Sequence, residues 1–81
     1  MHIPEAEHLV FLKLLVDLRR EAGLSQAELA EHLQVPQSFV SKYEAGERRL
    51  AFTEVVQICK ALRISPRQFV NRFEKSRTKR G

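Results

Sequence analysis

The chain has 81 residues, the size of one small domain, and 43% of them are hydrophobic. A core of this size is modest, so a partner subunit that covers further apolar surface is expected. The net charge of +4 favours a polyanionic partner, with nucleic acid ahead of an anionic membrane, and no apolar run reaches the length of a membrane span.

The charges are divided unevenly along the chain. Up to Leu33 there are three basic and six acidic residues, whereas from Gln34 onward there are eleven basic and four acidic residues. The positive field therefore belongs to the second half, as expected for a face that binds nucleic acid. The single cysteine, Cys59, cannot form an intramolecular disulfide, and the start of the chain lacks the pattern of a secretory signal. The expected location is cytoplasmic.

Apolar residues at helical spacing predict a first helix from about Glu5 to Ala22. One face of this helix is assigned to the core and contains Phe11, Leu14, Leu15, Leu18 and Ala22. A second stripe, formed by Leu9, Leu12 and Val16, is more apolar surface than a small core needs. This stripe either packs against Val70 and Phe73 of the last helix or lies at an interface with a second subunit.

Two short helices joined by a tight turn are predicted next. A capping box of Ser25 and Glu28 begins a helix at about Gln26–Leu33, whose alanines and leucines are expected to be buried. Pro36 breaks the chain, since proline disfavours a helical residue before it and suits the first turn of a following helix. The next helix, about Gln37–Glu44, is too short and polar to be stable alone, so its neighbours must hold it.

Two further helices complete the prediction. The first, from about Phe52 to Leu62, is apolar around much of its circumference and is expected to be central, with Cys59 as a small buried hydrophobe. A second capping box, Ser65 with Gln68, opens a fifth helix that is expected to end near Lys75.

The chain is expected to divide into a folded domain of residues 1–75 and a disordered basic tail of residues 76–81. The tail's basic residues are read as solubilising, with a flexible phosphate-binding arm as the alternative. No strand-like alternation is present, so the fold class is all-α with five short helices.

Residues 15 to 69 resemble the phage repressor/Cro type of helix-turn-helix domain, the Xre family, through the run LRREAGLSQAELAEHLQVPQSFVSKYEAGERR and the later VVQICKALRISP. The resemblance implies a compact five-helix bundle in which the second and third helices form the helix-turn-helix. It also implies a sequence-specific regulator of transcription, a repressor, which binds double-stranded DNA and reads the major groove with its third helix.

A homodimer on a palindromic operator is expected, because apolar surface is in excess and paired subunits read DNA half-sites one helical turn apart. The alternative is an antitoxin-like interaction module that binds DNA mainly in complex with a partner protein. A third option is an accessory DNA-binding subunit without an operator of its own.

The resemblance carries roles onto individual positions. The residues that it places against base edges are Gln37, Ser38 and Lys42. The residues that it places against DNA phosphates are Gln26, Ser41, Arg48 and Arg49. Arg19 and Glu44 match a pair that joins the first helix to the end of the third, and a partly buried ion pair that orients the reading helix is expected there.

Two residues depart from the family pattern at the start of the reading helix. Pro36 replaces the usual Ser or Thr cap, at a cost of about 1 kcal/mol. Phe39 is bulky where smaller residues are usual, and either packs on the second helix or touches thymine methyl groups. For Arg48 and Arg49 the alternative reading is an ordinary solvated charge pair.

No metal, cofactor or small-molecule ligand is expected. The histidines, His2, His8 and His32, lack the spacing of metal ligands. The sequence shows no nucleophile–base pattern and no glycine-rich phosphate loop, so an enzyme is not expected.

Overall fold

Five helices account for most of the residues that the structure describes. The structure is a computed structural model that describes residues 5–79, with side chains described for residues 5–77. In chain order the helices are α1 (Glu5–Glu21), α2 (Gln26–Leu33), α3 (Gln37–Glu44), α4 (Phe52–Ala61) and α5 (Pro66–Lys79). Residues 5–79 contain no strand, and the predicted all-α class is confirmed.

The observed ends of the helices differ from the predicted ones mainly in α5. The bounds of α2 and α3 match the prediction, and α1 and α4 each end one residue early. α5 continues to Lys79, so residues 76–79 are helical where a tail was expected. In this polar segment Arg77 donates to Glu74 and to Glu7 of α1, both at 3.1 Å, which gives the helix an anchor. Residues 80 and 81 of the predicted tail lie outside the described residues.

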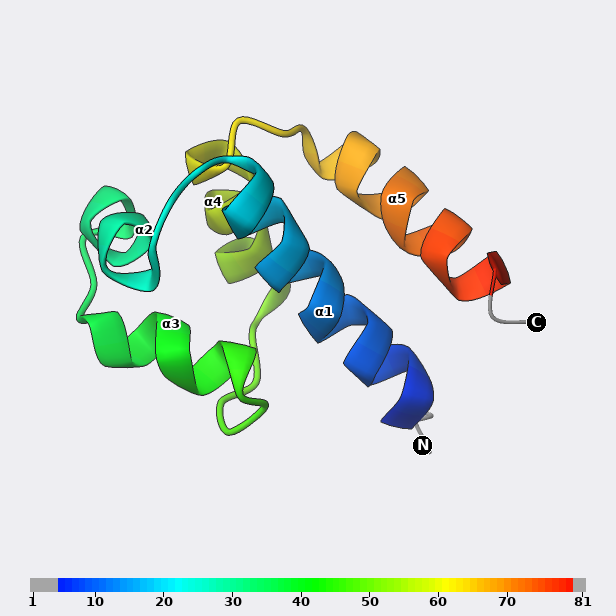
Figure 1. The fold of residues 1–81 in the computed structure, drawn as a ribbon, viewed down its shortest axis with the longest axis horizontal. Helices are drawn as coiled ribbons and strands as arrows, with labels where there is room; N and C mark the ends of the chain where they lie inside the picture. Colours follow the sequence, from blue (N-terminus) through cyan, green and yellow to red (C-terminus); the bar gives the residue numbers. More distant parts are fainter. Residues whose placement is uncertain (1–4, 80–81) are drawn as a thin grey trace.

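The helices form two groups around α4. α1 and α5 lie side by side and antiparallel, while α2 and α3 pack together on the other side of the molecule (Figure 1). α4 packs against both α2 and α5. The α1–α5 pair is joined by Glu21 with Arg72, at 2.9 Å, and by Glu7 with Arg77. α3 is left along the edge of the molecule, where one of its sides faces outward.

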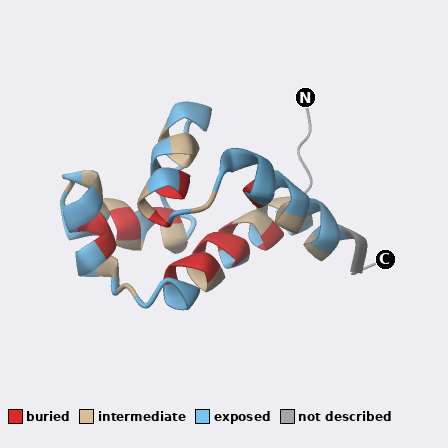
Figure 2. Ribbon diagram, turned by 90° about the horizontal axis from the view of Figure 1, so that it is seen from above, coloured by how far each residue is buried: buried red, intermediate tan, exposed pale blue. Residues whose placement is uncertain are grey.

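The core lies between the inner faces of the helices, where the buried residues gather in Figure 2. Its fully buried side chains are Leu15, Leu29, Val40, Tyr43, Ile58 and Cys59. Phe69 of α5 completes it, with its ring edge-on to Phe11 of α1 at a centroid distance of 6.0 Å. The prediction that Cys59 is a buried small hydrophobe is confirmed, and burial raises the pKa of its thiol.

The second apolar stripe of α1 meets the loop after α3. Leu12 is buried, and its Cδ1 lies 3.4 Å from the position that a Cβ at Gly46 would take. Val16 is half-buried, whereas Leu9 remains 59% exposed. This stripe was predicted to meet α5 or a second subunit, and the loop around Gly46 is a further partner.

Several apolar residues lie further from the core than predicted. Ala22 and Ala27 are exposed; Ala22 follows the last residue of α1 and so leaves the buried face of that helix. Val70 is 52% exposed on α5, although Phe73 packs partly against the core. Phe52, at the start of α4, is 75% exposed. These positions are the apolar surface that the five helices do not cover.

Candidate nucleic-acid interface

α2 and α3 are joined by the turn Gln34-Val35-Pro36. Gln34 ends α2 in the left-handed conformation, with φ 59° and ψ 44°. The N–H of Val35 donates to the carbonyl of Ala30 at 3.0 Å. This bond satisfies a carbonyl of the last turn of α2 that has no partner within the helix, and it turns the chain toward α3. Glycine is the usual residue in this conformation, so the residue type at position 34 does not predict it.

The two helices begin in different ways. Ser25 and Glu28 form the predicted capping box of α2, with distances of 3.0 and 2.8 Å between each side chain and the other residue's backbone nitrogen. Pro36 occupies the N-cap of α3 and offers no side-chain acceptor, as its residue type predicts. The start of α3 is held by a backbone bond instead, from the N–H of Phe39 to the carbonyl of Pro36 at 3.0 Å.

α3 is anchored on one side and polar on the other. Val40 and Tyr43 are fully buried in the core. The three residues predicted to contact bases, Gln37, Ser38 and Lys42, are all exposed. Ser41 is half-buried, and its hydroxyl donates to the carbonyl of Ser38 at 3.2 Å, so the hydroxyl has to turn away from that carbonyl before it can donate to a phosphate.

Arg19, near the end of α1, and Glu44, the last residue of α3, form a bidentate ion pair. Arg19 donates from Nε at 2.8 Å and from Nη2 at 3.1 Å to the two carboxylate oxygens of Glu44, and from Nη1 to the carbonyl of Leu24 at 2.8 Å. Gln26, at the start of α2, donates from Nε2 to the same carboxylate at 2.9 Å. We call these contacts of Arg19, Leu24, Gln26 and Glu44 the buried junction.

The buried junction joins all three N-terminal helices. The side chains of Arg19 and Glu44 are only 10% and 6% exposed, and the hydrogen bonds from Arg19 to Glu44 raise the pKa of the guanidinium. A pair this deep fixes geometry more than it adds net stability, because desolvation offsets much of the attraction. It therefore joins the start of α2 to the end of α3, and it holds the amide of Gln26, the residue predicted to meet a phosphate.

The loop after α3 begins with a left-handed glycine. Gly46 has φ +81°, and the N–H of Glu47 donates back to the carbonyl of Lys42 at 2.8 Å. Glycine reaches this conformation without strain, which makes it the residue suited to end α3 here. The loop then presents the two arginines of the predicted phosphate site.

These two arginines are placed differently. Arg48 donates from Nη1 and Nη2 to the two oxygens of Glu54, at 3.1 and 3.0 Å, and from Nη1 to the carbonyl of Arg49 at 3.0 Å. Its Cζ lies 4.4 Å from the centroid of the Phe39 ring. The side chain of Arg49 is exposed and forms no ion pair within the described part of the chain. We call the contacts of Phe39, Arg48 and Glu54 the loop junction.

Phe39 is turned toward the interior side of the loop. Its ring is half-buried, meets Tyr43 edge-on at 5.8 Å, and lines a small hollow with residues of α2, the turn and α4, namely Leu33, Val35, Thr53, Glu54, Gln57 and Ile58. Phe39 thus shares this hollow with Leu33 at the end of α2 and with the start of α4, and Arg48 lies over its ring.

The partners of Arg48 that support the site, Glu54 and Phe39, were not predicted from the sequence. Glu54 lies three residues after Ala51 and accepts from its N–H at 2.8 Å, so it has the spacing of a capping box without the usual Ser or Thr. That spacing was the available signal. The stacking of Arg48 on Phe39 has no signal in the sequence, because it depends on the path of the loop after α3.

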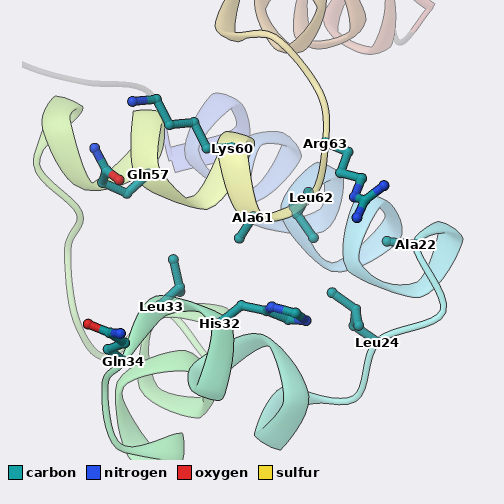
Figure 3. Close-up of a pocket in the computed structure, with 10 residues that line it drawn as sticks. All are labelled: Ala22, Leu24, His32, Leu33, Gln34, Gln57, Lys60, Ala61, Leu62 and Arg63. Atoms are coloured by element: carbon teal, nitrogen blue, oxygen red, sulfur yellow. The ribbon is translucent and has the colours of Figure 1, made fainter.

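A further hollow of the described surface lies apart from α3. It is a groove of about 950 Å³ between the C-terminal ends of α2 and α4, lined by Ala22, Leu24, His32, Leu33, Gln34, Gln57, Lys60, Ala61, Leu62 and Arg63 (Figure 3). Its ionisable residues are His32, Lys60 and Arg63. Cations beside helix C-termini balance the helix dipoles, and the same dipoles disfavour an anion in the groove.

The described residues contain no group of three or more side chains placed to hold a metal ion. His2 lies outside those residues. Within residues 5–79, each helix is too short or too polar to cross a lipid bilayer.

Comparisons with known proteins agree with this geometry. A helix-turn-helix family profile matches residues 15–69. The structure of an XRE-family like protein from Pseudomonas syringae pv. tomato str. DC3000 superposes with a TM-score of 0.82 and is 39% identical in sequence, over 88% of this chain and 87% of that one. No curated protein matches the chain.

Proposed function

Because this chain belongs to the XRE family of helix-turn-helix DNA-binding regulators, we propose that it is a sequence-specific repressor of transcription that acts by occupying an operator. The observation that carries the proposal is the division of α3. Val40 and Tyr43 fix one side of the helix in the core, while a row of polar side chains is held outward. A helix presented in this way suits the major groove of double-stranded DNA.

In the proposed complex, bases and phosphates are read by different residues. The base contacts are Gln37, Ser38 and Lys42, whose side chains carry the donors and acceptors that match base edges. The phosphate contacts are Gln26, Ser41, Arg48 and Arg49, with the free N–H groups at the start of α2 adding to Gln26. Phosphate contacts release counterions, so affinity falls as salt rises.

We also propose that two copies bind a palindromic operator in the cytoplasm. The apolar surface left uncovered on α5, at Val70, supports a second subunit on this side of the domain. Sedimentation at tens of micromolar should give the mass of two chains. The mass of one chain would contradict the dimer, but it would not bear on the proposal that α3 reads DNA.

Selection of bound duplexes from a random DNA pool tests the function. A palindromic motif is expected, with half-sites about one helical turn apart. Enrichment of a single half-site would support sequence readout by a monomer. No enrichment by the isolated protein, followed by enrichment once a partner protein is added, would favour the antitoxin-like alternative.

A further inference from the structure

The two arginines of the loop differ in how much of their positive charge is available to bind DNA. Arg48 faces a carboxylate that accepts two hydrogen bonds from it, so most of its charge is neutralised within the protein. Arg49 is exposed and has no such partner within the described residues. Three of the five N–H donors of Arg48 are already used, two on Glu54 and one on the carbonyl of Arg49, so only two remain for a phosphate.

Phe39 also holds the guanidinium of Arg48 in place. Its ring lies beneath the guanidinium, with 4.4 Å between Cζ and the ring centroid, a distance at which a cation is attracted to the face of an aromatic ring. The ring is itself held by its edge-on contact with Tyr43, which is fully buried. The platform under Arg48 is therefore part of α3 and is fixed to the core.

Glu54 extends the same set of contacts to α4. One of its oxygens accepts from the N–H of Ala51 at 2.8 Å and from Arg48 at 3.1 Å. The loop junction thus connects the side of α3 to the first turn of α4, across the loop that carries Arg49. Its members are placed to fix where that loop lies.

We propose that Arg48 is a positioning residue, held on Phe39 and Glu54, and that Arg49 supplies the phosphate contact of this loop. This inference rests on the proposed binding of DNA and revises the equal roles expected for the two arginines. Arg48 then acts through the path of the loop, and its own charge adds little to the release of counterions.

The salt dependence of DNA binding distinguishes the two roles. Each phosphate contact contributes about −0.9 to the slope of log K against log salt concentration. We would measure this slope for the full chain and for the matched variants Arg48→Gln and Arg49→Gln, using one duplex of the selected sequence and one of unrelated sequence. Thermal unfolding of each variant establishes that it is folded at the temperature of the assay.

For Arg49→Gln the slope should become less negative by about 0.9 on both duplexes. For Arg48→Gln the slope should stay at the parent value while affinity falls several-fold. An equal loss of slope in Arg48→Gln would overturn the proposal, and so would unchanged affinity in that variant. The unrelated duplex separates this test from the proposed function, because phosphate contacts are measurable even if the protein shows no preference for sequence.

Phe39→Leu provides a second test that leaves every charge in place. Leucine keeps apolar volume but removes the ring beneath Arg48. The expected result is a several-fold loss of affinity with an unchanged slope. If the folded Phe39→Leu protein bound DNA with the affinity of the parent, the ring of Phe39 would have no role in holding Arg48 for DNA binding.

Discussion

The buried junction and the loop junction use the same chemistry in different surroundings. Each contains a bidentate arginine–glutamate pair: Arg19 with Glu44 joins α1 to α3, and Arg48 with Glu54 joins the loop after α3 to α4. The side chains of Arg19 and Glu44 are 10% and 6% exposed, whereas those of Arg48 and Glu54 are 40% and 32% exposed. Burial is the main difference between them.

That difference assigns the junctions different tasks. When one partner of a buried pair is lost, the other charge stays buried with neither a counter-charge nor water around it. The loss of folding free energy is then several kcal/mol. When one partner of an exposed pair is lost, water replaces it at little cost. The buried junction should therefore control whether the domain folds, and the loop junction should control how the folded domain meets DNA.

Arg19→Ala should have the largest effect on stability. It leaves the carboxylate of Glu44 buried without its cation, at a cost of about 3–5 kcal/mol, with the lower end expected because Gln26 still donates to Glu44. Chemical denaturation measures this change. Arg48→Ala is the matched variant in the loop junction and should shift the denaturation midpoint little. Equal losses in the two variants would contradict the role of burial.

Gln37→Ala tests the reading face that the two junctions orient. This residue is exposed at the start of α3, and its loss should cost about 1–3 kcal/mol of discrimination at one base position. Affinities for the selected operator and its single-base variants measure the effect. Arg49→Ala is the control and should weaken binding to all of these sequences alike. If Gln37→Ala weakened binding to all of these sequences equally, Gln37 would contact the DNA backbone and not a base.

Local patterns were sufficient to predict the helix-turn-helix itself. Capping at Ser25 and the proline at position 36 are signals within a few residues of the helix ends that they mark, and the bounds of α2 and α3 were predicted to the residue. The pairing of Arg19 with Glu44, 25 residues apart, came from the family resemblance and not from periodicity.

The features that were not predicted depend on distant segments. The last turns of α5 are held by a contact between Arg77 and Glu7, 70 residues apart in the sequence. Similarly, Leu12 packs against the loop at Gly46, and Arg48 lies on Phe39. Hydrophobic spacing describes which face of a helix is apolar, but it does not specify which loop or charge will meet that face.

A substitution outside both junctions should separate stability from DNA binding. Gln34 has φ 59°, a conformation that costs a residue with a side chain about 1–2 kcal/mol. Because glycine also gains freedom in the unfolded chain, Gln34→Gly should stabilise the fold by only about 0.5–1 kcal/mol. Thermal unfolding measures the gain, and operator affinity should be unchanged. Arg63→Gly, with φ 60° at the end of α4, is the matched control and should give a similar gain.

The smallest expected effect is the pH dependence of the loop junction. The hydrogen bonds from Arg48, followed by that from the N–H of Ala51, lower the pKa of Glu54 below its ordinary value of 4.5. A carboxylate whose pKa is lower in the folded protein stabilises it above about pH 4.5, and this contribution is lost as the pH falls through the lowered value. Glu54→Gln keeps an acceptor for Ala51 but removes the charge.

The parent should therefore be slightly more stable than Glu54→Gln at neutral pH, and the difference should vanish in acid. Denaturation midpoints of the two proteins across the acidic range measure it. The carboxylate of Glu28, whose pKa is lowered by its capping bonds with Ser25, is present in both proteins, so its titration cancels in the comparison. A difference that persists unchanged in acid would mean that Glu54 acts through its shape and capping bond, and that its charge does not hold Arg48.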